Sequence, residues 1–155
     1  MRPAPVLLAV AALVTIGTAE AIASNAQLAD LPGRAQPGLS ASGALLTVVG
    51  IALSVAVYAA LGIVLARDRS DEATVLRTGI AVGLGAGLVG GMIRAYLIGD
   101  YLGGVLSRYG LEDFLSWTLA VFVALSVGVS VAAGASLTWL SFRGWRRRLR
   151  PRPPS

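Results

Sequence analysis

The sequence has no cysteine, no histidine and no lysine among its 155 residues. Without cysteine the chain has neither disulfides nor a thiolate nucleophile, and without histidine it has neither a His-ligated haem nor a Ser-His-Asp triad. The usual zinc sites require the same two residue types. Because the sequence also shows no acid/base pair and no nucleophile beside a base, it predicts a protein that is not an enzyme and holds no cofactor or metal. All 13 basic residues are arginine, which indicates GC-rich coding and a bacterial source.

Charge is also scarce. Charged residues make up 14% of the chain and apolar residues 55%, whereas a soluble domain carries about 25% charged residues. Four continuous apolar runs have about the 20 residues that a helix needs to cross a hydrocarbon core ~30 Å thick. They are residues 5–24, 43–66, 78–99 and 115–141. Strands of a membrane barrel alternate in polarity over ~10 residues, which these runs do not. The sequence therefore predicts an all-α integral membrane protein, a four-helix bundle in a single domain over residues 1–142.

The arginines predict the orientation of this bundle. Arg67, Arg69 and Arg77 lie between the second and third runs, and six more lie at the C-terminus, whereas the other two connections hold one each. Loops rich in arginine stay in the cytoplasm. We therefore expect both termini to be cytoplasmic, in the bacterial inner membrane. The connections at residues 25–42 and 100–114 then lie outside, the latter along the membrane interface.

The first run allows a second interpretation. "MRPAPVLLAVAALVTIGTAEAIASNA" has the layout of a secretory signal peptide, with Arg2 before an apolar stretch and small residues before a possible cleavage site. The n-region is weak and Glu20 lies close to that site, so we favour a retained helix. Cleavage would leave three helices with the same orientation.

The third run is rich in glycine. "GAGLVG" at residues 85–90 fits the dinucleotide-binding G-x-G-x-x-G pattern, but no strand–helix–strand unit surrounds it. Glycines at four-residue spacing instead allow two membrane helices to approach closely. We predict a helix-packing stripe on this face, while Gly85 faces away. The stripe consists of Gly79, Gly83, Gly87, Gly90 and Gly91.

Two charges lie inside the apolar runs. Arg94 projects within about 60° of the glycine stripe on a helical wheel, and Glu20 lies at nearly the same depth of the first run among small residues. An ionisable residue in a membrane is costly and usually has a partner. We therefore predict an intramembrane Glu20–Arg94 ion pair, with snorkelling of Arg94 to the headgroups as the alternative.

Polar residues at helical spacing follow the second and fourth runs. Interhelical hydrogen bonds explain them, and a polar conduit is the alternative. The residues are Thr47, Gly50, Ser54 and Tyr58, and Ser126, Ser130, Gly134 and Thr138.

The C-terminal residues 143–155 form a basic, Pro-rich tail that we expect to be disordered and to anchor the chain at anionic lipid headgroups. No aromatic platform for nucleic acid accompanies it. Its arginines are Arg143, Arg146, Arg147, Arg148, Arg150 and Arg152.

Together these features predict a small, non-catalytic membrane protein that acts as a homo-oligomer or as an accessory subunit of a larger membrane complex. The alternative is a small transporter or channel that uses the Glu20/Arg94 pair.

Overall fold

The computed structural model describes the backbone of residues 3–29 and 41–149, and the side chains of residues 4–25 and 44–148. This part of the chain contains four long helices, a short 3-10 helix and no strand. The elements are α1 (Pro3–Ala29), α2 (Ala41–Arg67), α3 (Glu72–Ser107), η2 (Glu112–Phe114) and α4 (Leu115–Leu149). All four long helices are long and apolar enough to cross a membrane, so the chain fits a multi-pass membrane protein.

The helices extend beyond the predicted runs. α3 begins at Glu72, inside the expected charged turn, and continues to Ser107, through much of the segment expected along the interface. At 1.5 Å per residue its 36 residues span about 54 Å, well beyond a ~30 Å hydrocarbon core. α4 likewise continues through Leu149, so the first part of the tail that we expected to be disordered is helical. Arg150 and Arg152 lie outside the described residues.

A tight turn ends α2, and a side-chain cap then begins α3. Arg69 adopts a positive φ of 54°, while the Ser70 and Arg69 amides donate to the Leu65 and Ala66 carbonyls at the end of α2. This is the Schellman arrangement, with arginine where glycine is usual. Asp71 then caps α3 by accepting a hydrogen bond from the Thr74 amide. Hydrogen bonding by the Thr74 side chain, and to a lesser extent by its amide, holds the pKa of the Asp71 carboxyl below its ordinary value.

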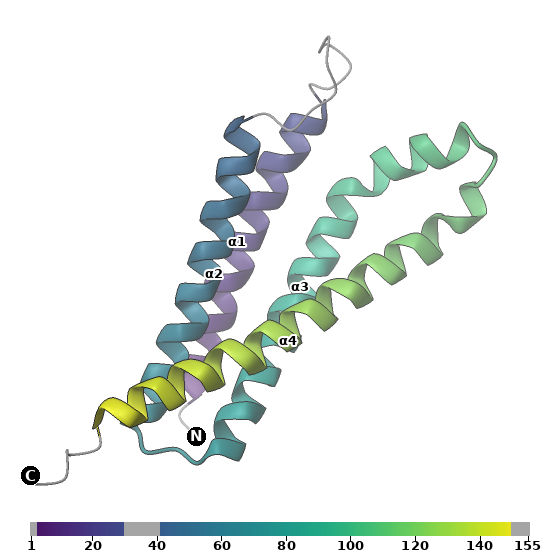
Figure 1. Cartoon of the computed structure of the whole chain (residues 1–155). Coiled ribbons are helices and arrows are strands. Elements are labelled where there is room, and N and C mark those ends of the chain that lie inside the picture. The colour runs from purple at the N-terminus through teal and green to yellow at the C-terminus, as the bar shows by residue number, and fades with distance from the viewer. Residues whose placement is uncertain (1–2, 30–40, 150–155) are drawn as a thin grey trace, which may run out of the picture.

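The helices form two antiparallel pairs, α1 with α2 and α3 with α4 (Figure 1). α1 also packs on α3, and α2 on α4, whereas α2 barely touches α3 and α1 does not contact α4 within the described residues. The order around the centre is therefore α1, α2, α4, α3. The start of α1, the α2–α3 turn and the end of α4 lie at the same end of the molecule (Figure 1).

The buried core lies near that end. Val75, Val82 and Phe142 are fully buried, and Tyr58 and Leu61 nearly so. Towards the other end the two helical pairs diverge (Figure 1), and every described α2 residue from Ala44 to Val49 is exposed. The molecule is thus tightly packed at one end and open at the other.

Glycines bring α3 against α4. A Cβ built on Gly79 or Gly83 would overlap the backbone carbonyl of Gly134 or Ser130, and one on Gly87 would lie 2.8 Å from the Val127 Cα. Gly91 is less tight, with Ser126 Cβ at 3.3 Å. Gly79, Gly83 and Gly87 therefore contact the backbone of the partner helix, as a GxxxG series does in lipid.

Gly90 does not belong to this contact, contrary to the expectation from the sequence. No neighbouring atom lies within 4 Å of a Cβ built there. Each step of four residues turns by about 40° around a helix. The series of glycines that contacts α4 therefore continues at Gly91 and leaves Gly90 to one side. Gly90 faces a cavity instead. Gly85, expected to face away, lies on the side of α1, because a Cβ built on it would be 3.6 Å from the Val10 methyl groups.

The first prediction separates packed from unpacked glycines on α3. Gly83→Ala should lower the free energy of unfolding by about 1–3 kcal/mol, because its methyl group must displace the α4 backbone. Gly90→Ala is the matched control on the same helix and should be neutral or stabilising, because its methyl group enters empty space. Thermal unfolding in detergent measures both. Equal losses in the two variants would show that this contact does not hold α3 against α4.

Candidate functional site

The centre of the helix ring is a cavity of about 530 Å³ lined by residues of all four helices. Most of its wall is aliphatic, with Leu13 from α1, Ile51 and Val55 from α2, and Leu125 and Val129 from α4. This volume lies within the range of small-molecule binding sites. The cavity begins where the two helical pairs diverge, so its position follows from the fold.

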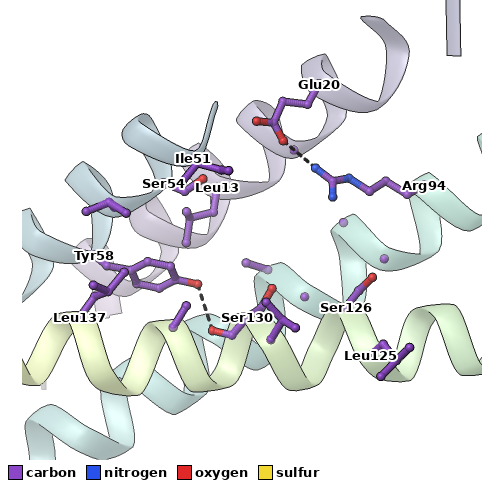
Figure 2. A pocket seen from close by; sticks show the side chains of 18 of the residues that line it. Leu13, Glu20, Ile51, Ser54, Tyr58, Arg94, Leu125, Ser126, Ser130 and Leu137 are labelled. Carbon is purple, nitrogen blue, oxygen red and sulfur yellow. Dashed lines mark hydrogen bonds and ion pairs between the residues drawn. The ribbon is translucent and has the colours of Figure 1, made fainter. Parts of the chain in front are cut away.

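One end of the cavity carries two charges that lie within candidate membrane spans. Arg94 Nη2 on α3 donates to Glu20 Oε2 on α1 at 2.7 Å, and Figure 2 shows the two side chains pointing towards one another across the space between the helices. The side chains are 39% and 22% exposed, respectively. The structure thus brings together the two residues that the sequence paired.

One glycine makes room for this pair, and a second lies beside it. A Cβ on Gly17 of α1 would lie 3.9 Å from Arg94 Nη2, and a Cβ on Gly50 of α2 would overlap the Glu20 carboxylate. The sequence analysis assigned Gly50 to the polar stripe of the second run and did not predict its contact with Glu20. A side chain at position 50 would have to push the carboxylate away from α2.

The pair leaves hydrogen-bonding capacity unused. Glu20 Oε1 is buried without a partner among the described residues. Within the same part of the chain, Arg94 makes no other hydrogen bond than the one to Glu20. A buried polar atom without a partner is costly, so the burial of Oε1 against Gly50 of α2 offsets part of what the pair contributes to stability.

Tyr58 lines the cavity away from the charged pair. Its hydroxyl donates to the Ser130 carbonyl of α4 at 3.4 Å (Figure 2), and its side chain lies against Gly134. Ser54 and Ser126 also line the wall. The polar stripes of α2 and α4 thus border the cavity only in part: Ser54, Tyr58, Ser126 and Ser130 line it, and Thr47, Gly50, Gly134 and Thr138 do not.

The basic end of α4 forms a second cluster. Arg143 stacks 4.3 Å from the Trp139 ring and Arg146 5.3 Å from that of Phe142. Arg143, Arg146, Arg147 and Glu72 line a surface cavity of about 300 Å³, and Arg143 contacts Glu72 at 3.5 Å. Arg148 is exposed beside them.

No group of three or more acidic side chains that could hold a metal is present among the described residues. No protein-family model matches this chain, and neither curated proteins nor solved structures give a match. The class of protein follows from the helices alone: an all-helical chain with four candidate membrane spans.

The second prediction concerns the ion pair. Glu20→Gln and Arg94→Gln should each lower the free energy of unfolding by about 1–3 kcal/mol, because each leaves a charge without its partner. The double variant Glu20→Gln/Arg94→Gln should lose less than the sum of the single losses, because it leaves no charge behind. Chemical unfolding in mild detergent, analysed as a double-mutant cycle, measures this coupling. Strictly additive losses would contradict it.

Proposed function

We propose that this chain is a small, non-catalytic, multi-pass protein of the bacterial inner membrane that acts by helix packing, as a homo-oligomer or as an accessory subunit of a larger complex. The proposal is supported by the outward face of α4. A second stripe of small residues at four-residue spacing runs along this helix, and each of them is exposed. The outer stripe consists of Ser116, Ala120, Ala124, Gly128, Ala132 and Ser136.

This outer stripe lies opposite the face that α4 uses within the chain. Ser126, Ser130 and Gly134 contact the glycines of α3, and residues two positions further along a helix point about 200° away. Small residues in lipid let another helix approach closely enough for backbone packing. A Cβ on Gly128 meets no atom within 4 Å, so the face is open to such a helix.

The third prediction tests the outer stripe as a contact between copies of the chain. The native chain has no cysteine, so Gly128→Cys introduces a single thiol. If two α4 helices pack around a twofold axis, this variant should form a disulfide-linked dimer on mild oxidation in membranes. Leu53→Cys, exposed on α2, is the control and should remain monomeric.

The matched packing variants are Gly128→Leu and Val129→Leu. The first should abolish dimers because a large side chain separates the helices, and the second should keep them because Val129 is already large and exposed. Cross-linking of Gly128→Cys to a different protein would instead assign the stripe to an accessory subunit. Absence of any cross-link would contradict the proposal.

The orientation proposed from the arginines has both termini in the cytoplasm. The α2–α3 turn carries Arg67 and Arg69, and the end of α4, at the same end of the molecule, carries further arginines (Figure 1). Anionic lipid headgroups are the proposed partner of Arg143, Arg146 and Arg147, at about 1 kcal/mol per arginine.

The fourth prediction tests this orientation. Reporter fusions in the two turns, at Ser70 and at Gly110, should report opposite sides of the membrane, with Ser70 cytoplasmic. Alkaline phosphatase activity measures an external position, and fluorescence of a cytoplasmic reporter an internal one. The same side for both fusions would exclude four spans.

A small transporter or channel is the second candidate function. It is favoured by the cavity that contains the Glu20–Arg94 pair, because intramembrane charges commonly mark substrate or ion pathways. Tyr58, whose hydroxyl joins α2 to the Ser130 carbonyl of α4, would then be a gate along this pathway.

A further inference from the structure

We infer that the surface cavity between the start of α3 and the end of α4 is a binding site for a phosphomonoester, a phosphate group with a single ester bond. This inference rests on the proposed contact of the chain with anionic headgroups and narrows it to one headgroup chemistry. Three observations support it: the net charge of the cavity, the N–H groups that its arginines leave unused, and the level of the cavity relative to the apolar runs.

Three arginines on one face of α4 meet a glutamate of α3. Arg143, Arg146 and Arg147 are separated by three and four residues, so their side chains lie on the same face of the helix. Together with Glu72 they line a cavity of about 300 Å³. Three positive charges and one negative charge leave a net charge of +2 around this cavity. The neighbouring Arg148 is exposed but does not line it.

Aromatic rings hold two of these arginines in position. The guanidinium of Arg143 lies 4.3 Å from the centre of the Trp139 ring, and that of Arg146 lies 5.3 Å from the centre of the Phe142 ring. Phe142 is fully buried, so the core fixes the ring that supports Arg146. A planar guanidinium stacked on a ring keeps the N–H groups at its edge available. The positive charges are therefore positioned before a ligand arrives.

Most of these N–H groups have no partner in the described part of the chain. Arg143 contacts Glu72 through Nε at 3.5 Å, whereas Arg146 and Arg147 make no hydrogen bond or ion pair with any described residue. Each guanidinium presents five donors in a fork that can bind two phosphate oxygens at once. The cavity thus offers many more charged donors than the Glu72 carboxylate can accept from.

The net charge selects among anions. A phosphomonoester carries about −1.5 to −2 charges at pH 7 and three strong acceptor oxygens, so it matches the +2 of the cavity. A phosphodiester carries one negative charge and leaves one positive charge of the cavity uncompensated. A carboxylate also carries one charge and has only two oxygens. A phosphomonoester therefore fits this cavity best.

The cavity lies at the ends of two apolar runs. Glu72 precedes the start of the third run at Thr78 by six residues, and Arg143 follows the end of the fourth run at Ser141 by two. In a membrane, side chains at this level meet the headgroups and not the hydrocarbon core. A phosphomonoester on a lipid, as in phosphatidic acid, reaches the cavity from the membrane side, and a soluble phosphate ester reaches it from the water.

The fifth prediction tests the headgroup preference. The full-length protein in mild detergent is offered phosphatidic acid, a phosphomonoester, and phosphatidylglycerol, a phosphodiester, with identical acyl chains. Native mass spectrometry counts the bound lipids. Phosphatidic acid should bind about tenfold more tightly, because the diester leaves a charge unpaired. Equal binding of the two lipids, or a preference for phosphatidylglycerol, would overturn the inference.

A soluble competitor distinguishes the two sources of the phosphate. Glycerol 3-phosphate carries the same phosphomonoester without acyl chains. If the lipid is the natural ligand, glycerol 3-phosphate at about a hundredfold excess should leave phosphatidic acid bound, because the chains add apolar contacts. Displacement of phosphatidic acid at an equal concentration would assign the cavity to a soluble phosphate ester. Both outcomes keep the chemistry of the site and differ in the source of its ligand.

Two neighbouring arginines of α4 provide matched variants. Arg147→Gln removes a charge from the cavity and should abolish the preference for phosphatidic acid, whereas Arg148→Gln removes the same charge outside the cavity and should keep it. Neither arginine makes a hydrogen bond or ion pair with a described residue, so neither variant removes such a contact of the fold. Equal effects of the two variants would show a diffuse basic surface. That result would overturn the inference and leave both the proposed contact with anionic headgroups and the proposed oligomerisation intact.

Discussion

The close approach of α3 to α4 is the constraint on which the rest of the structure depends. In lipid, apolar side chains gain little by leaving their surroundings, so helices associate through van der Waals packing and hydrogen bonds. Gly79, Gly83 and Gly87 let the α3 backbone meet the α4 backbone directly, which maximises such packing. The residues of α3 that contact α4 shift around the helix along its length. This contact ends near Gly91, and the opposite face of α3 is free to meet α1.

The central cavity is a consequence of that geometry. Near the α2–α3 turn, Gly62 lets α2 approach the α4 backbone at Thr138, and the four helices close around Val75, Val82 and Phe142. Further along, the helical pairs diverge (Figure 1). There the Arg94–Glu20 bond joins α3 to α1 across the opening. An ion pair holds two helices together at a separation that small side chains could not span, so it helps to keep the space open.

The sequence predicted the four helices and the partners Glu20 and Arg94, because length, hydropathy and the depth of a charge are local properties of the chain. It did not predict the helix ends. The cap at Asp71 and the positive φ of Arg69 lie in a polar stretch without periodicity, where helix and turn are hard to distinguish. It also misassigned Gly90 and missed the contact of Gly50 with Glu20, since both depend on crossing angles that one helical wheel does not contain.

The two faces of α4 explain how one helix can serve both the fold and an assembly. Its inner face, at Ser126, Ser130 and Gly134, is occupied by α3 and α2. Its outer stripe repeats the same four-residue spacing with small, exposed side chains, and Ser136 donates its hydroxyl within α4 itself, to the Ala132 carbonyl. The charged pair and the cavity lie on the inner side, so a helix docked on the outer stripe would leave Glu20 and Arg94 undisturbed. Assembly through the outer face and transport through the cavity are therefore compatible in one molecule.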